Sequence, residues 1–396
     1  MNKLLHLFQC LMAVGFLFAG CASEITAPTE PVIPTGTIHP MDDAFLASIS
    51  ETGHCFVYTP PNYDADRADA YPTVYMLNGF SGDENYFIEL FSAVDAADWL
   101  LSRGEIEPMI LVFLSGHSAM GGSFYTDSPH PTVLHSERHI LDIAAAVDGA
   151  YNTVADPSGR AVFGHSMGGF GAVSVAMNNP ALFGSIGALA GPLSFWGTKT
   201  APPHADTTYK GLEELLPSVL KETSYDAILA QTRGIGDIAE FQRLMAPSAA
   251  RRVTTMIFAM AAAFSPTNPL QPTATTIAAY SVDLPIGIDG RLEMTTWTRW
   301  MAFDPVSRFN QGQAVSLSYK NLFLDAGAED ELGLNNGHQI FAGAIQPAAS
   351  SLAIHLTHYE TYESILDAQG GIVKADHTAM TYERLKVYLK WQSEQF

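Results

Sequence analysis

Residues 164–168 read Gly-His-Ser-Met-Gly, and they lie between a short apolar run at 160–163 and a glycine-rich stretch with helical spacing that starts at Gly169. This order predicts a strand, a sharp turn and a helix, and such a turn raises the hydroxyl of Ser166 clear of its surroundings. Flanking glycines let neighbouring backbone approach without a Cβ clash. The pattern by itself also fits an ordinary helix N-cap serine. Its flanks and the partners further along the chain favour Ser166 as a nucleophile.

Apolar runs alternate with helical patterns along the chain, which is typical of a mostly parallel sheet covered by helices. At 396 residues the chain can form one large α/β domain with insertions or two smaller domains. Helices are predicted where apolar residues recur at helical spacing, at 137–151, 167–179 and 378–392. The predicted strands are 55–59, 73–78, 109–114, 160–163, 185–190, 321–325 and 353–359.

The charge balance excludes one class of partner. The chain has a formal net charge of -21, and its basic residues form no cluster. A nucleic-acid-binding face needs clustered lysine and arginine, so we expect no nucleic-acid partner. The acidity is typical of a soluble surface on which like charges keep molecules apart.

The amino-terminal segment predicts export. Residues 1–21 have a short basic start, an apolar stretch and a small-residue site that ends at Cys21, as in a lipoprotein-type signal peptide. Phe18 stands where the bacterial lipobox usually has leucine, so lipid anchoring in the cell envelope and simple release both stay open. Residues 22–45 are rich in Thr and Pro and are expected to form a flexible tether. Cys55 would then be the free cysteine of the folded domain, and we expect it to be a small buried residue.

Three motifs together resemble one known family. They are Tyr-Pro-Thr-Val-Tyr-Met-Leu-Asn-Gly at 71–79, Phe-Tyr-Thr-Asp at 124–127, and Phe-Gly-His-Ser-Met-Gly-Gly-Phe-Gly-Ala at 163–172. These motifs resemble the putative-esterase family of the α/β-hydrolases, which includes esterase D, S-formylglutathione hydrolases, feruloyl esterases and secreted mycolyltransferases. The resemblance implies an α/β-hydrolase core at 46–195 and 304–396, and chemistry that needs no metal or organic cofactor.

A serine nucleophile needs a base, and in this fold the chain order is Ser, then Asp or Glu, then His. His377 lies in a loop just before the last predicted helix, which is where the resemblance places the catalytic histidine. His338 falls in a helical pattern, and His355 and His358 fall in a strand-like run. We therefore expect His377 to be the base.

The acid should follow the run Asn-Leu-Phe-Leu at 321–324, where Asp325 and Asp330 both stand. The sequence Gly-Ala-Glu-Asp that ends at Asp330 is similar to the family's G-x-x-D pattern, which favours Asp330 as the triad acid. Asp325 could instead hold the loop through backbone hydrogen bonds. Asp376, beside His377, is a further possibility, and Glu331 is expected to be a solvated neighbour.

An oxyanion also needs donors, which in this fold are backbone N–H groups. The resemblance implies Met167, the residue after the nucleophile, and Phe80, in the loop after the strand at 73–78. Many relatives have histidine where this chain has Asn78, which puts the hydrogen bonding of that loop in question.

Residues 196–303 do not match the compact family core and are predicted to form a cap or lid. Helical spacing occurs at 212–220 and 235–245, and residues 253–264 are unusually apolar. That apolar stretch is too short to span a bilayer. It would pack the cap onto the core, or it would line an acyl or aryl pocket with Met and Phe side chains. Trp297 and Trp300 are expected to brace the cap hinge.

These features predict an exported serine carboxylic-ester hydrolase with Ser166, His377 and Asp330 as its triad. The expected partner is a small-molecule or polysaccharide-linked ester, with membrane contact only through the amino-terminal anchor. Two alternatives stay open. One is an acyltransferase of the same family, and the other is a non-catalytic surface binding module with a hydrolase fold.

Overall fold

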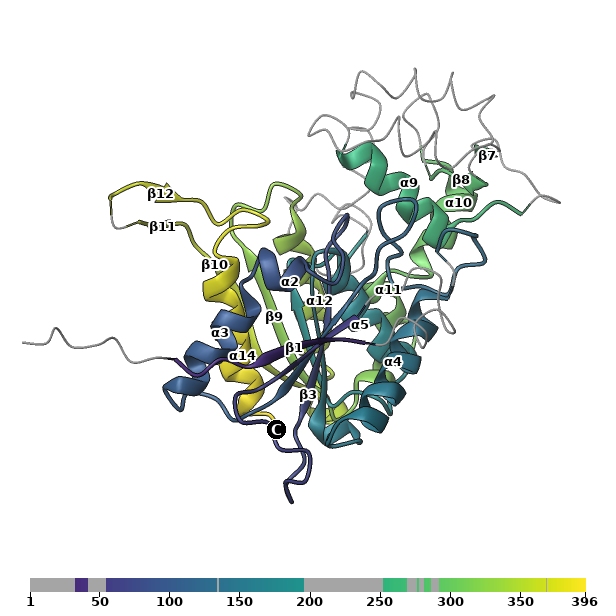
Figure 1. The fold of residues 1–396 in the computed structure, drawn as a ribbon. Coiled ribbons are helices and arrows are strands. Elements are labelled where there is room, and N and C mark those ends of the chain that lie inside the picture. Colours follow the sequence, from purple (N-terminus) through teal and green to yellow (C-terminus); the bar gives the residue numbers. More distant parts are fainter. Residues whose placement is uncertain are drawn as a thin grey trace, which may run out of the picture. The chain divides into compact units, whose positions relative to one another are not determined.

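An eight-stranded sheet forms the centre of the computed structural model (Figure 1), with the strand order β1-β2-β4-β3-β5-β6-β9-β10. The model describes residues 33–41, 55–133, 135–195, 252–268, 276–277, 281–285, 292–367 and 369–396. The predicted signal peptide and the predicted cap helices at 212–220 and 235–245 lie outside these ranges. The strands are β1 Thr37–Pro40, β2 Cys55–Thr59, β3 Thr73–Leu77, β4 Ile110–Leu114, β5 Arg160–His165, β6 Ser185–Leu189, β9 Asn321–Gly327 and β10 His355–Tyr362.

Each predicted strand is present, and the α/β-hydrolase fold is confirmed. The pairs from β4 through β10 are parallel, whereas β2 runs antiparallel to both β4 and β1. Strand β5 runs on past its predicted end, through Gly164 to His165. The carboxyl end of this central strand therefore leads directly into the serine turn.

Strand β1 differs from the expectation of a flexible tether at 22–45. Its residues pair in register with β2, from Thr37 opposite Thr59 to Pro40 opposite Phe56. The N–H of Gly36 also donates to the carboxylate of Asp98, 2.9 Å away. These long-range partners order residues 37–40, although their local composition resembles that of a linker.

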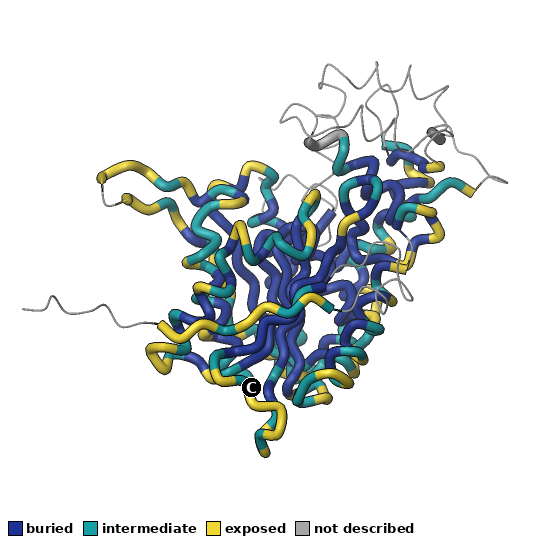
Figure 2. Tube along the Cα trace, viewed as in Figure 1, coloured by how far each residue is buried: buried dark blue, intermediate teal, exposed yellow. Residues whose placement is uncertain are grey.

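Side chains alternate between the two faces of the sheet, because successive residues of a strand point to opposite sides. On β3, Tyr75 and Leu77 belong to one buried cluster, and Val74 and Met76 belong to the other. Figure 2 shows these central strands as the most buried part of the molecule. The first face is covered by α4 (Ser136–Ala150), α5 (Met167–Asn178) and α12 (Leu334–Ile345). The second face is covered by α3 (Ala93–Ser102) and α14 (Thr381–Ser393).

The apolar stretch predicted at 253–264 is the helix α9 (Arg252–Phe264). Its residues from Ile257 onward are buried against the first face. The ring centroid of Phe264 lies 5.5 Å from those of Phe124, Phe170 and Trp300. This packing agrees with the expectation that the helix joins the predicted insertion to the core.

Asp304 joins the two ends of the predicted insertion. Its carboxylate caps α11 (Pro305–Asn310) by accepting from the N–H of Ser307, and it also accepts from the N–H of Phe195. Burial raises the pKa of Asp304 to about 6, and the donated hydrogen bonds oppose that rise. One carboxylate thus holds together the points where the chain leaves the core and returns to it.

The remaining elements are short, and none of the helices in the described ranges has the length and apolar character needed to cross a membrane. They are α2 Tyr86–Glu89, α10 Met294–Met301, α13 Ala349–Leu352, β7 Thr276–Ile277, β8 Val282–Asp283, β11 Ile365–Leu366, β12 Ile372–Val373, and the 3-10 turns Pro157–Gly159 and Gln313–Leu317.

Candidate active site

Ser166 occupies a strained turn between β5 and α5. Its backbone has φ 57° and ψ -120°, a conformation that non-glycine residues rarely adopt. The turn is held by a hydrogen bond of 2.8 Å from the N–H of Ser166 to the carbonyl of Leu189. A Cβ atom on Gly164 would lie 2.1 Å from the backbone of Gly168, and one on Gly168 would lie 1.8 Å from the carbonyl oxygen of Leu77. Both motif glycines are therefore required by close backbone packing.

The structure brings Ser166, His377 and Asp330 into contact. The Nε2 atom of His377 lies 2.8 Å from Ser166 Oγ, and its Nδ1 atom lies 2.9 Å from Asp330 Oδ2. A carboxylate accepts, so Nδ1 carries the proton and Nε2 is left to accept from the serine hydroxyl. Each of the three residues is less than a tenth exposed. This arrangement is a nucleophile, a base and an orienting carboxylate in hydrogen-bond series.

The position of the three residues follows from the order of the strands. Strand β3 has β4 on one side and β5 on the other, so the chain reverses its direction of winding there. Ligand sites of open α/β sheets lie at such a point, beyond the carboxyl ends of the strands. Ser166 follows the carboxyl end of β5, and Asp330 follows the carboxyl end of β9.

The other two candidate acids have different partners. Asp325 is fully buried in β9 and bonds to the guanidinium of Arg384. Asp376 accepts from the N–H of Thr378, 3.2 Å away, within its own loop. Asp330 is the candidate carboxylate that reaches the His377 ring, and its second oxygen accepts from the N–H of Leu332 at 2.9 Å.

The backbone of His377 is held on both sides. Its N–H donates to Glu331 Oε2, 3.1 Å away, and its carbonyl oxygen lies 2.9 Å from His165 Nε2. Glu331 is exposed, as expected, yet it is also a partner of this loop. Sequence patterns do not reveal these contacts, because Glu331 and His165 are far from His377 along the chain.

Asn78 orders the loop after β3. Its Oδ1 atom accepts from the N–H of Gly116 at 2.6 Å and from the Tyr125 hydroxyl at 2.8 Å, while its Nδ2 donates to the carbonyl of Gly79 at 2.8 Å. Asn78 therefore supports this loop through three side-chain hydrogen bonds. The loop continues to Phe80.

Comparison with known proteins identifies the family of the segment that carries the serine turn. A family model described as "Putative esterase" matches residues 47–227, a range that contains the serine turn. This segment belongs to the putative esterase family. The esterase-family segment includes β2 to β6 and α5, so the match covers the part of the sheet that carries Ser166.

Solved structures resemble this chain over most of its length. A ferulic acid esterase shares 15% identity, covers 91% of this chain and 99% of its own, and has a TM-score of 0.52. An S-formylglutathione hydrolase from Agrobacterium tumefaciens shares 18% identity, with 91% and 96% covered and a TM-score of 0.50. A fluorophosphonate-binding serine hydrolase from Staphylococcus aureus shares 14% identity, with 91% and 99% covered and a TM-score of 0.50. At these identities the likeness establishes the fold.

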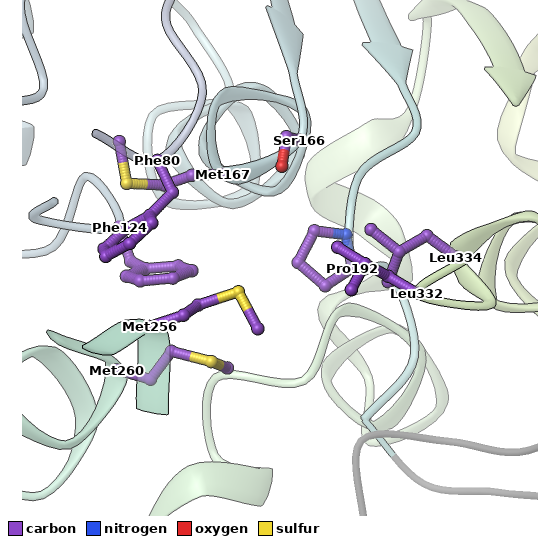
Figure 3. A pocket seen from close by; sticks show the side chains of 9 residues that line it. All are labelled: Phe80, Phe124, Ser166, Met167, Pro192, Met256, Met260, Leu332 and Leu334. Atoms are coloured by element: carbon purple, nitrogen blue, oxygen red, sulfur yellow. The ribbon is translucent and has the colours of Figure 1, made fainter. Parts of the chain in front are cut away.

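A pocket opens beside Ser166 (Figure 3). Met256 and Met260 of α9 face Phe80 and Phe124 across it, so α9 both packs on the core and lines the pocket. Both roles predicted for this helix, packing on the core and lining a pocket, therefore occur together. The described lining residues are apolar apart from Ser166: Phe80, Phe124, Met167, Pro192, Met256, Met260, Leu332 and Leu334.

Phe80 and Met167, the two residues predicted to supply oxyanion donors, both line this pocket with Ser166. Met167 is the first residue of α5, and the first N–H groups of a helix have no acceptor within the helix. The position of both residues is compatible with donation toward a carbonyl oxygen bound at Ser166.

The other candidate histidines have structural contacts. His338 is buried in α12, where its Nε2 accepts from the N–H of Gly191 at 2.8 Å, and burial lowers its pKa to about 4. His358 on β10 stacks on the Phe323 ring with centroids 4.0 Å apart. His355 is an exposed residue at the start of β10.

One group of side chains in the described ranges has the composition of a metal site. Ligand atoms of Asp325, His358 and Glu360 lie within 4.8 Å of one another. The Arg384 guanidinium bonds to both carboxylates, however, and supplies the positive charge that they need. These residues therefore form an ion-pair network on β9 and β10, with Asp325 buried and Glu360 exposed.

Proposed function

We propose that this chain is an exported serine carboxylic-ester hydrolase that acts through an acyl-enzyme intermediate. The observation that carries the proposal is the continuous series from Ser166 Oγ to His377 Nε2 at 2.8 Å and from His377 Nδ1 to Asp330 Oδ2 at 2.9 Å. Its position in an esterase-family segment, on the strained turn of an α/β-hydrolase fold, supports the same conclusion.

In the proposed reaction Ser166 Oγ attacks the ester carbonyl carbon while His377 Nε2 takes the hydroxyl proton. Asp330 orients the ring and stabilises the imidazolium that forms. The N–H groups of Phe80 and Met167 donate to the oxyanion. His377 then gives its proton to the leaving alcohol. A water molecule attacks the acyl-enzyme, with His377 as base, and releases the acid and free Ser166.

The proposed substrate is an extracellular ester, either a small molecule or one linked to a polysaccharide. Export is inferred from residues 1–21, with Cys21 as the anchor of a lipoprotein or as the point of release. The apolar lining of the pocket supports an alkyl or aryl group on the ester. A similar solved structure is a ferulic acid esterase, which agrees with an aryl substrate.

Covalent labelling tests the proposal. A fluorophosphonate probe should attach to the peptide that contains Ser166, as located by mass spectrometry, and should stop hydrolysis of a p-nitrophenyl ester. A folded sample that takes up no label would favour a non-catalytic binding module. Hydrolysis in the presence of a sugar that yields mainly acylated sugar would favour the acyltransferase.

The pocket should decide which acyl groups react. We expect Met256→Trp, which fills the pocket from its half-buried rim, to lower the selectivity for p-nitrophenyl hexanoate over acetate by about tenfold to hundredfold. The reason is that the longer chain loses the space that it occupies, whereas acetate does not reach it. The measurement is kcat/KM for both esters.

Met294→Trp is the matched control, since Met294 is 56% exposed on α10 and outside the pocket. It should leave the selectivity as it is in the unmodified chain. Equal selectivity in both variants would show that the acyl chain does not occupy this pocket.

A further inference from the structure

A second series of hydrogen bonds runs beside the triad. The Tyr86 hydroxyl lies 2.6 Å from His165 Nδ1, and His165 Nε2 lies 2.9 Å from the carbonyl oxygen of His377. This series ends on the backbone of His377, whereas Ser166 and Asp330 contact its ring. Two neighbouring residues, 165 and 166, therefore hold His377 at two separate points.

The chemistry of the three groups fixes the direction of each bond. A carbonyl oxygen can only accept, so His165 Nε2 carries the proton and donates it. Nδ1 is then an acceptor, and the Tyr86 hydroxyl donates to it. Burial lowers the pKa of His165 to about 3 and raises the pKa of Tyr86, so both groups stay neutral around pH 7. One tautomer of His165 satisfies both partners.

The neutral state of His165 suits its position. Its ring centroid lies 4.9 Å from that of His377, which becomes an imidazolium in the proposed reaction. A charged His165 would repel that imidazolium, because like charges this close interact strongly in a buried site. A neutral ring holds the loop without this cost.

Tyr86 also contacts the loop that carries Phe80. A Cβ atom on Gly79 would lie 2.6 Å from the Tyr86 hydroxyl oxygen, and one on Gly82 would lie 2.5 Å from the Tyr86 ring. The tyrosine on α2 thus packs directly against both glycines. It lies at the junction of the predicted oxyanion loop, the serine turn and, through His165, the His377 loop.

We propose that Tyr86 and His165 are positioning residues, which set the His377 ring and the loop at 79–82 at their working distances from Ser166. The proposal rests on the proposed function, since it assigns these residues a role in the same reaction. Neither side chain exchanges a proton or a bond with the substrate. Their effect comes from geometry, because a displacement of about 1 Å in an active site lowers the rate by about a hundredfold.

Tyr86→Phe is the sharpest test, because it removes one oxygen atom and keeps the ring that packs on Gly79 and Gly82. We expect kcat for a p-nitrophenyl ester to fall by about tenfold to hundredfold, with KM within about twofold of the unmodified chain. His165→Leu removes both bonds and should lower kcat at least as far. His165→Gln offers an N–H to His377 and an oxygen to Tyr86, so it should recover most of the lost rate.

Tyr58→Phe is the matched control. Like Tyr86, Tyr58 donates a side-chain hydrogen bond, here to Asp98 at 2.7 Å, but it is fully buried on β2 outside the site. Loss of the Tyr58 hydroxyl should lower the unfolding temperature and leave kcat unchanged. Unfolding temperatures of all variants, measured by circular dichroism, separate lost stability from lost positioning.

The proposal is overturned if Tyr86→Phe keeps kcat within twofold of the unmodified chain, if the loss appears in KM, or if His165→Gln is no faster than His165→Leu. Should His165→Leu not fold, Tyr86→Phe decides alone. Failure of the proposed function looks different, because Ser166→Ala would then keep full turnover. An inactive Ser166→Ala together with a fully active Tyr86→Phe would reject the positioning role alone.

Discussion

Ser166→Ala is expected to lower kcat for a p-nitrophenyl ester by about 10⁴- to 10⁶-fold, the range found when the nucleophile of a serine hydrolase is removed. The variant has no oxygen for His377 to deprotonate, and an acyl-enzyme cannot form. The residual rate would come from the oxyanion donors and from substrate binding. Steady-state and burst kinetics measure the effect, since the burst of p-nitrophenol should disappear together with turnover.

Ser174→Ala serves as the control for this result. Ser174 is buried in α5, two turns beyond Ser166, and its hydroxyl has no hydrogen-bond partner in the described part of the chain. Its replacement should leave kcat unchanged. If both variants hydrolyse the ester at the rate of the unmodified chain, Ser166 is not the nucleophile and the serine mechanism is wrong.

The second large effect separates Asp325, which lies within β9, from Asp330, which follows that strand. We expect Asp330→Asn to lower kcat by about 10⁴-fold, because an amide in place of the carboxylate favours the wrong tautomer of the His377 ring. Asp325→Asn should leave kcat per folded molecule nearly unchanged, since Asp325 bonds to Arg384 and lies outside the contacts of His377.

The two variants should rank in the opposite order for stability, with Asp325→Asn less stable than Asp330→Asn. Asp325→Asn breaks a buried ion pair and is expected to lower the free energy of unfolding by about 3 kcal/mol. Urea unfolding measures this change, and titration with the fluorophosphonate counts folded active sites. A low kcat in Asp325→Asn beside an active Asp330→Asn would assign the triad acid to Asp325.

Local sequence patterns were sufficient for much of the sheet and for the serine turn. Strands such as β2 and β4 are short apolar runs, and a strand buried on both faces needs such a run. The Gly-x-Ser-x-Gly turn is also local, because all of its residues lie within the same few positions. Its two glycines are required by close backbone packing, which the strand-turn-helix order already implies.

Local patterns failed where the partner lies far along the chain. Strand β1 has a linker composition and is ordered by β2. Met256 has the same helical spacing as its buried neighbours, so the sequence left open whether this helix packs on the core or lines a pocket. Tyr86 belongs to a helix of four residues with no motif, and its role depends on His165, 79 positions away.

The strands of the eight-stranded sheet from β2 to β10, the turn at Ser166 and the resemblance to esterases were determined by the sequence alone, because each depends on neighbouring residues. The tertiary structure decided which carboxylate reaches His377 and what holds that histidine in place. Asp325 and Asp330 are close in sequence, but one points into an ion pair with Arg384 and the other reaches the His377 ring. The physical reason is that hydrogen bonds depend on distances between atoms, and those distances are set only when β5, β9 and the loop before α14 come together.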